Sequence, residues 1–230
     1  MLSPSISEWV AGSGRRVSSS ATSLGNALGR ASPDGSGYVR SMPTEEHRER
    51  GRTRWITHGE RSIYASRWVD VRLVDVEAPD GQRFEHHVLR MQRVAVVAVL
   101  DATQDAILML RRHRFIDDSW GWEVPVGIVE SGEDPAATAA REVEEETGWR
   151  PRELSRVLEF QPAIGIADTP HELFTAVGAE LIGEPTDITE ADEVAWVPVK
   201  DVLGMVSDGR IRDGATLVAV LHLLASRRST

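Results

Sequence analysis

The chain has 230 residues, a formal net charge of −10 at neutral pH and 41% hydrophobic residues, enough for one substantial core with a small appendage. The acidic excess argues against a protein that binds nucleic acid through a general basic surface, although a metal ion or arginine can still bind phosphate locally. The absence of cysteine excludes disulfides, thiolate catalysis and cysteine-based zinc sites. The longest apolar run, Val94–Leu100, is far shorter than the roughly 18–20 residues of a membrane-spanning helix. We therefore expect a soluble, cytoplasmic protein that uses neither membrane nor nucleic acid as a partner.

Residues 1–52 differ in composition from the rest of the chain. They are rich in Ser, Gly and Arg, with few large apolar residues and no sustained period, which predicts a disordered low-complexity tail. Two other interpretations stay open. The segment up to Ala31 bears Ser and Arg and is nearly free of acids, which is also typical of an organelle transit peptide. Alternatively, translation begins at Met42, where the polarity of the chain changes.

Residues 53–92 carry the pattern of β-strands. Apolar and polar residues alternate over 69–73, Pro79-Asp80-Gly81 supplies turn chemistry, and a second alternating run follows at 84–90. This pattern predicts a small N-terminal antiparallel β-sheet, separate from the domain that follows.

Residues 93–230 mix buried strands with helices. The nearly continuous apolar run of 93–100 is typical of a strand buried on both faces. The other predicted strands and helices are strands at 106–110, 154–159, 172–181 and 194–197, and helices at 201–207 and 215–226. The order of these elements predicts an α+β domain around a mixed sheet.

One further helix is predicted inside the stretch GIVESGEDPAATAAREVEEETGW, from Gly127 to Trp149. Asp134 is a suitable N-cap, Pro135 fits the first helical position, and Gly148 supplies a left-handed C-terminal stop. At 3.6 residues per turn, one face of this helix collects three carboxylates, those of Glu142, Glu145 and Glu146.

These three carboxylates repel one another, and they lie in the last turns, where the helix dipole also disfavours negative charge. The cluster therefore calls for a counter-cation at neutral pH. Ligands that are all oxygen indicate a hard ion, Mg²⁺ or alternatively Mn²⁺, whose remaining ligands would be waters and phosphate oxygens. A solvated acidic helix face is the competing interpretation of the Glu run alone.

The residue types around the helix and the spacing between them resemble the complete signature of the Nudix hydrolase family. The matching residues are Gly127, Glu133, Arg141-Glu142-Val143, Glu145-Glu146, Gly148 and the bulky apolar Trp149. Trp149 is a mild departure, since the family more often has an aliphatic residue there. The resemblance implies an α/β/α sandwich with a mixed sheet and hydrolysis of phosphoanhydride bonds.

The resemblance also implies roles for individual residues. The metal ligands would be Glu142, Glu145, Glu146 and the backbone carbonyl of Val126, which stands where relatives have alanine. Arg141 would reach back to Glu133 and brace the loop that precedes the helix. Alignment on Pro198 makes Glu190 the best match for a glutamate that acts as base or extra ligand, with Glu193 as the second choice and the helix glutamates as further alternatives.

Within the family, the chain is most similar to the branch of ADP-ribose pyrophosphatases and nucleoside-diphosphate-sugar hydrolases. That branch carries an N-terminal sheet, often exchanged across a homodimer, and an Arg-Gln-Tyr-Arg segment that resembles residues 111–114 here. The substrate-binding candidates are Arg114 for phosphate or ribose, Glu123, Trp68 for base stacking, and Asp168, which is alternatively a loop N-cap. Arg111 and Arg112 are expected to be exposed surface arginines.

The function implied by the resemblance is Mg²⁺-dependent hydrolysis of a nucleoside diphosphate linked to another moiety, with ADP-ribose or a nucleotide sugar as substrate. An alternative within the enzyme class is a nucleoside triphosphate pyrophosphohydrolase. A second alternative is a ligand sensor that has kept the fold and lost catalysis, against which the intact acidic signature weighs.

Overall fold

The computed structural model describes residues 53–186 and 191–227 of the chain. The prediction of a disordered tail over 1–52 and the candidate base Glu190 therefore lie outside the described residues. Within the described ranges, no helix has the length and apolar character needed to cross a membrane.

A mixed seven-stranded sheet forms the centre of the larger domain. Its strands are β4 (Val94–Leu100), β5 (Ala106–Arg114), β6 (Ser119–Glu123), β7 (Val126–Ile128), β9 (Leu154–Phe160), β11 (His171–Val177) and β13 (Glu193–Pro198). The backbone order is β13-β5-β4-β11-β9, with β6 paired to β5 and β7 paired to β4. Strands β4 and β11 are parallel and the other pairs are antiparallel. The apolar run of β4 fits its position, because its residues are buried on both faces of the sheet.

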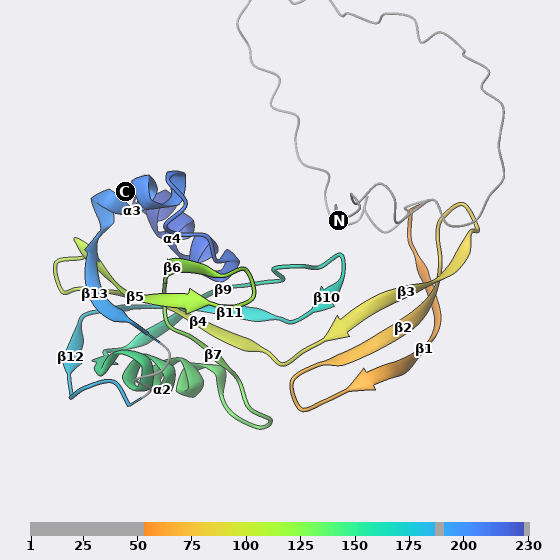
Figure 1. Cartoon of the computed structure of the whole chain (residues 1–230), viewed down its shortest axis with the longest axis horizontal. Helices are drawn as coiled ribbons and strands as arrows, with labels where there is room; N and C mark the ends of the chain where they lie inside the picture. Colours follow the sequence, from red (N-terminus) through yellow and green to blue (C-terminus); the bar gives the residue numbers. More distant parts are fainter. Residues whose placement is uncertain (1–52, 187–190, 228–230) are drawn as a thin grey trace, which may run out of the picture. The chain divides into compact units, whose positions relative to one another are not determined.

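Helices cover the two faces of this sheet (Figure 1). Helix α2 (Pro135–Thr147) packs Ala139 and Val143 onto one face. Helices α3 (Val199–Ser207) and α4 (Gly214–Ser226) pack a second cluster of buried residues onto the other face. The two separate hydrophobic clusters make the layered α/β/α arrangement that the sequence predicts.

The N-terminal sheet contains β1 (Ile56–Ala65), β2 (Asp70–Glu77) and β3 (Arg83–Arg90), which form the predicted antiparallel arrangement. A fourth strand, β10 (Ala167–Asp168), comes from the later part of the chain and pairs with β3 in parallel. Backbone hydrogen bonds of 2.9 Å from Leu89 to Ile166 and 3.0 Å from Met91 to Asp168 hold it there. The predicted boundary at residue 92 is therefore crossed by a segment that sequence analysis assigned wholly to the second domain.

A short two-stranded sheet, β8 (Trp149–Pro151) with β12 (Ala179–Leu181), follows the C-terminus of α2. Beyond β12, the backbone N–H of Thr186 donates to the carbonyl of Glu145 at 2.9 Å. The chain that leads towards residue 190 is thus attached to the turn of α2 that carries the glutamates.

Candidate active site

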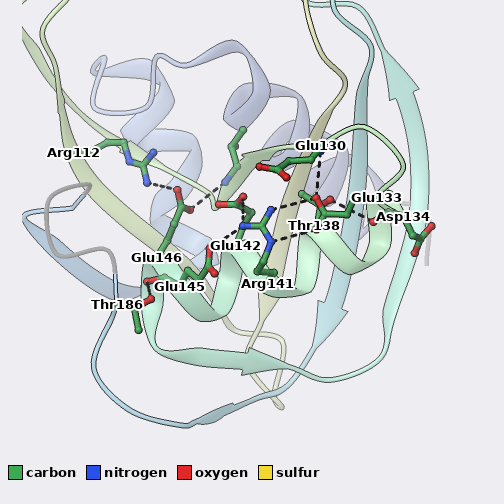
Figure 2. Close-up of polar contacts among 11 residues, drawn as sticks. Arg112, Glu130, Glu133, Asp134, Thr138, Arg141, Glu142, Glu145, Glu146 and Thr186 are labelled. Carbon is green, nitrogen blue, oxygen red and sulfur yellow. Dashed lines mark hydrogen bonds and ion pairs between the residues drawn. The ribbon is translucent and has the colours of Figure 1, made fainter. Parts of the chain in front are cut away.

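Helix α2 begins and ends where the sequence predicts. The Asp134 side chain accepts a hydrogen bond from the backbone N–H of Ala137 at 3.3 Å, and Pro135 occupies the first turn. Gly148 ends the helix with φ 74°, in the left-handed region, and its N–H donates to the carbonyl of Glu144 at 2.9 Å. Within these bounds the spacing of i, i+3 and i+4 brings Glu142, Glu145 and Glu146 to one face of the helix (Figure 2).

Arg141 connects the preceding loop to this acidic face. Its Nε lies 3.3 Å from Oε1 of Glu133, while its Nη1 lies 2.9 Å from Oε1 of Glu142 and 2.8 Å from Oε2 of Glu145. Glu133 also accepts from the backbone N–H of Glu130 at 3.3 Å, which closes the loop on itself. The predicted reach of Arg141 back to Glu133 is therefore present in the structure.

The charges in this contact shift the ionisation of both partners. The hydrogen bond from Arg141, assisted by Thr138, holds the pKa of Glu133 below its ordinary 4.5. Partial burial acts to lower the pKa of Arg141, but the hydrogen bond to Glu133 and the charge of Glu142 outweigh it and raise that pKa above its usual range. Both groups therefore stay charged across the neutral range.

Arg112 differs from its predicted exposed position. Its side chain is only 4% exposed, and its Nη2 donates to Oε1 of Glu146 at 2.7 Å, with Glu146 also 4% exposed (Figure 2). The other carboxylate oxygen of Glu146 accepts from the backbone N–H of Val126 at 3.3 Å. The sequence does contain a signal for burial, because every second residue of a strand lies on the same face, which places residue 112 beside the apolar residues 108 and 110. The prediction of a surface arginine was wrong since it ended that strand at Leu110, whereas β5 continues to Arg114.

The three glutamates predicted as metal ligands lie on α2 and Val126 lies on β7, and arginines contact the three carboxylates. Within residues 53–186 and 191–227, no three carboxylate or imidazole groups converge as a ready set of metal ligands. Around α2, four carboxylates (Glu133, Glu142, Glu145 and Glu146) meet two guanidinium groups (Arg112 and Arg141), so 4 − 2 leaves two negative charges in the contacts described. An all-oxygen donor set with two excess negative charges fits a hard divalent cation.

Of the two candidate bases outside the helix, Glu193 lies within the described residues and Glu190 does not. Glu193 begins β13 and lies opposite Arg111 of β5, so both side chains lie on the face of the sheet that carries α3 and α4. There it borders a pocket with Trp122 and Lys200. Arg112 and Glu146 lie on the other face, so the structure does not bring Glu193 to the helix glutamates.

Arg114 and Glu123 are paired with each other. Nε of Arg114 donates to Oε1 of Glu123 at 2.9 Å, and Nη2 contacts the second oxygen in a two-pronged ion pair. Glu123 is 4% exposed while Arg114 is 47% exposed, so only the arginine presents a substantial surface. A cavity of about 350 Å³ lies beside this pair, and Trp120 and Arg212 also line it.

Trp68 and Asp168 belong to the N-terminal sheet. Trp68 is 54% exposed in the turn between β1 and β2, with the guanidinium of Arg67 4.0 Å from its ring centroid. Asp168 accepts from Arg90 at 2.7 Å and from Gln161 at 3.0 Å. Arg90 links β3 to β10 through Asp168, and in the described residues of one chain none of these contacts connects Trp68 or Asp168 to the α2 glutamates.

Comparison with known proteins follows the same division of the chain. The NUDIX domain model matches residues 91–217, and the model of the nucleoside diphosphate sugar hydrolase N-terminal domain matches residues 55–89. The fold is similar to that of a solved ADP compounds hydrolase, with a TM-score of 0.66 at 17% identity, covering 76% of this chain and 95% of that one.

Two curated relatives are similar over most of their length. One is a CMP-5'-(N-acetyl-N-hydroxy-3-aminopropyl)phosphonate hydrolase from Streptomyces rubellomurinus, 46% identical over 74% of this chain and 82% of its own. The other is an ADP-ribose pyrophosphatase from Bacillus subtilis, 31% identical over 73% of this chain and 91% of its own. Nudix proteins generally use divalent metal ions, which agrees with the acidic cluster on α2. The chain belongs to the Nudix hydrolase family and is a Nudix pyrophosphatase.

Proposed function

We propose that the protein uses Mg²⁺ to hydrolyse the phosphoanhydride bond in a nucleoside diphosphate joined to a second moiety, such as ADP-ribose or a nucleotide sugar. The products are a nucleoside monophosphate and a phosphorylated remainder. The observation that carries this proposal is the cluster around α2, in which four carboxylates exceed two guanidinium groups; its members are Glu133, Glu142, Glu145, Glu146, Arg112 and Arg141.

Glu142, Glu145 and Glu146, with the carbonyl of Val126, are the residues that would hold Mg²⁺, and Mn²⁺ is an alternative because it accepts the same oxygen ligands. A bound ion of this kind neutralises phosphate oxygens and lowers the pKa of a coordinated water. Arg141 keeps its positive charge between Glu142 and Glu145 and holds the Glu133 loop against the helix. Its role is therefore to position the carboxylates.

Hydrolysis also needs a group that takes the proton of the attacking water. The position of Glu193 on the α3 face argues against it. We therefore assign proton transfer to Glu190 or to one of the helix glutamates. Glu190 is outside the described residues; four residues before it, the backbone N–H of Thr186 donates to the carbonyl of Glu145 at 2.9 Å.

The second moiety of the substrate is assigned to the cavity beside Arg114. Arg112 and Arg114 are two residues apart on β5, so their side chains leave the same face about 7 Å apart along the strand. Arg112, which holds Glu146, thus lies two residues along the same strand face from the arginine that lines this cavity. The Streptomyces relative acts on a CMP-linked phosphonate, so we extend the proposed substrates beyond adenine nucleotides.

We further propose a homodimer that forms through the N-terminal sheet and acts in the cytoplasm. Every residue of β1 is exposed, and Ile63 and Tyr64 in it are 45% and 60% exposed. An exposed strand at a sheet edge that carries large apolar side chains favours pairing with a second copy. Trp68, in the adjoining turn, would then be available to a substrate bound by the partner.

The proposal is tested by incubating the purified chain with ADP-ribose, nucleotide sugars, CMP-linked compounds, NADH, dinucleoside polyphosphates and nucleoside triphosphates, with Mg²⁺, Mn²⁺ or EDTA. Products are identified by mass spectrometry. We expect nucleoside monophosphate from at least one diphosphate-linked compound and no turnover in EDTA. Turnover of triphosphates alone, or metal-dependent binding without any product, contradicts the proposal.

A further inference from the structure

Arg112 is buried where β5 faces the end of α2. Its side chain and that of Glu146 are each 4% exposed, and Nη2 to Oε1 is 2.7 Å. The adjacent Arg111, by contrast, is 38% exposed and pairs with Asp192. Of these two adjacent arginines, only Arg112 is enclosed, and it contacts Glu146 of α2.

An enclosed ion pair is a poor means of stabilising a fold. Removing two charges from water costs free energy that their mutual attraction repays only in favourable geometry, and apolar residues of similar volume are often as stable. The burial of Arg112 is therefore better explained by the side chain that it holds in place than by a contribution to stability. That side chain is the carboxylate of Glu146, one of the proposed metal ligands.

The two oxygens of Glu146 are held from two different strands. Arg112 on β5 donates to Oε1, and the backbone N–H of Val126 on β7 donates to Oε2 at 3.3 Å. Donors on both sides leave the carboxylate little freedom to rotate, and the strands that carry the donors are themselves paired within the main sheet. Glu142 and Glu145 contact Arg141, which belongs to the same helix as they do.

We propose that Arg112 is a positioning residue for the hydrolysis, which orients the Glu146 carboxylate and supplies a permanent positive charge beside it. This inference rests on the proposed function of Glu146. Arg112 acts on the reaction through Glu146 and does not contact the substrate. An arginine suits this role because its guanidinium is planar, always charged and directs its N–H groups in fixed directions, whereas the ammonium of lysine is a compact point charge.

The test is a double-mutant cycle on the full chain, with kcat, KM, the Mg²⁺ concentration for half-maximal rate, and the melting temperature measured for each variant. The variants are Arg112→Met, Arg112→Gln, Arg112→Lys, Glu146→Gln and Arg112→Met combined with Glu146→Gln. The matched control is Arg150→Met, which breaks another arginine–glutamate pair of α2, at 2.7 Å to Glu144, where Arg150 is 58% exposed. The substrate is whichever diphosphate-linked compound the wild-type chain hydrolyses.

We expect Arg112→Met to lower kcat or raise the half-maximal Mg²⁺ concentration by about 10- to 100-fold, with KM for the nucleotide nearly unchanged. In the Glu146→Gln background, Arg112→Met should change kcat and the half-maximal Mg²⁺ concentration by less than about twofold, because the residue that Arg112 positions is already altered. Lysine at 112 should recover more of the rate than glutamine, and Arg150→Met should leave all the kinetic constants unchanged.

Two outcomes overturn the inference. In the first, Arg112→Met keeps the wild-type kcat and Mg²⁺ dependence. In the second, Arg112→Met lowers kcat equally in the wild-type and Glu146→Gln backgrounds, which means that Arg112 affects the whole fold and not the Glu146 carboxylate. If Arg112→Met does not fold, Arg112→Gln takes its place in the cycle and is judged by the same two criteria. A wild-type chain that hydrolyses no diphosphate-linked compound refutes the proposed function itself, whereas an active wild type with unaffected Arg112 variants refutes only the role of Arg112.

Discussion

A Cβ atom on Gly127 would lie 2.0 Å from Cγ of Glu142. The glycine of β7 therefore leaves the space in which the first glutamate of the cluster packs, and a methyl group there must push the glutamate away. We expect Gly127→Ala to lower kcat by roughly 10²-fold, since a displacement of about 1 Å at a reacting site can cost that much. The assay is steady-state hydrolysis with a parallel melting curve. Gly204→Ala on α3 is the control, because its Cβ would meet nothing within 4 Å, and a loss of equal size in both variants would contradict this account.

Glu146→Gln preserves the size of the side chain and removes its charge. We expect a loss of kcat at least as large as the roughly 10- to 100-fold that follows when an outer partner of a metal ligand is removed. Glu144→Gln is the matched control on the same helix, because Glu144 contacts Arg150 instead of the cluster. Nearly full Mg²⁺-dependent turnover by Glu146→Gln would show that this glutamate is not part of the metal site.

The choice between the two candidate bases can be made kinetically. Because Glu193 lies on the α3 face, we expect Glu193→Gln to keep most of the activity. If Glu190 takes the proton of water, Glu190→Gln lowers kcat by about 10²- to 10⁴-fold, the usual contribution of a positioned base. The measurement is kcat as a function of pH for both variants. Loss of activity in Glu193→Gln alone would reverse the assignment.

Acid should weaken the loop that precedes α2. Arg141 holds the pKa of Glu133 below 4.5, so the folded state binds this proton less readily than the unfolded chain does. The contribution to the free energy of unfolding is complete above pH 4.5 and is lost as the pH falls through the folded-state pKa. Urea unfolding at pH values from 7 down to 3 should therefore give a shallower decline for Glu133→Gln than for wild type. Parallel declines would mean that the Glu133–Arg141 contact does not contribute to stability.

The proposed dimer predicts a sedimentation result. At micromolar concentration the wild-type chain should sediment as two copies, and Tyr64→Arg on the exposed strand β1 should give a monomer. Leu203→Arg on α3 is the control, since Leu203 is also an exposed apolar residue, at 46%, but lies in another part of the fold. A monomeric wild type would rule out the exchanged-sheet arrangement.

Sequence reasoning was most successful where the physics is local. The bounds of α2 follow from a capping carboxylate, a proline and a left-handed glycine, all of which act within one turn of the helix. The same locality explains why Arg141 was correctly expected to reach Glu133, since loop and helix are adjacent in the chain.

Contacts between distant segments were harder to predict. The alternation in β13 groups Glu193 with Ala195 and Val197, but it does not say which face of the sheet that group occupies. The partner of the buried Arg112 is likewise hard to predict, because Glu146 on α2 is 34 positions away in the sequence. The pairing of β10 with β3 has no signal at all in two residues, Ala167 and Asp168, which are too short for any periodic pattern.

The parallel pairing of β10 with β3 has a practical consequence for anyone who shortens the protein. A fragment that starts at residue 93 would remove Leu89 and Arg90, the register partners of Ala167 and Asp168, and with them a side-chain contact at 2.7 Å. The connection from β9 to β11 would then lose its neighbour while the glutamates of α2 stayed in place. Such a fragment should therefore still cleave, but choose among nucleotides differently from its parent, so assays of substrate preference need the longer version.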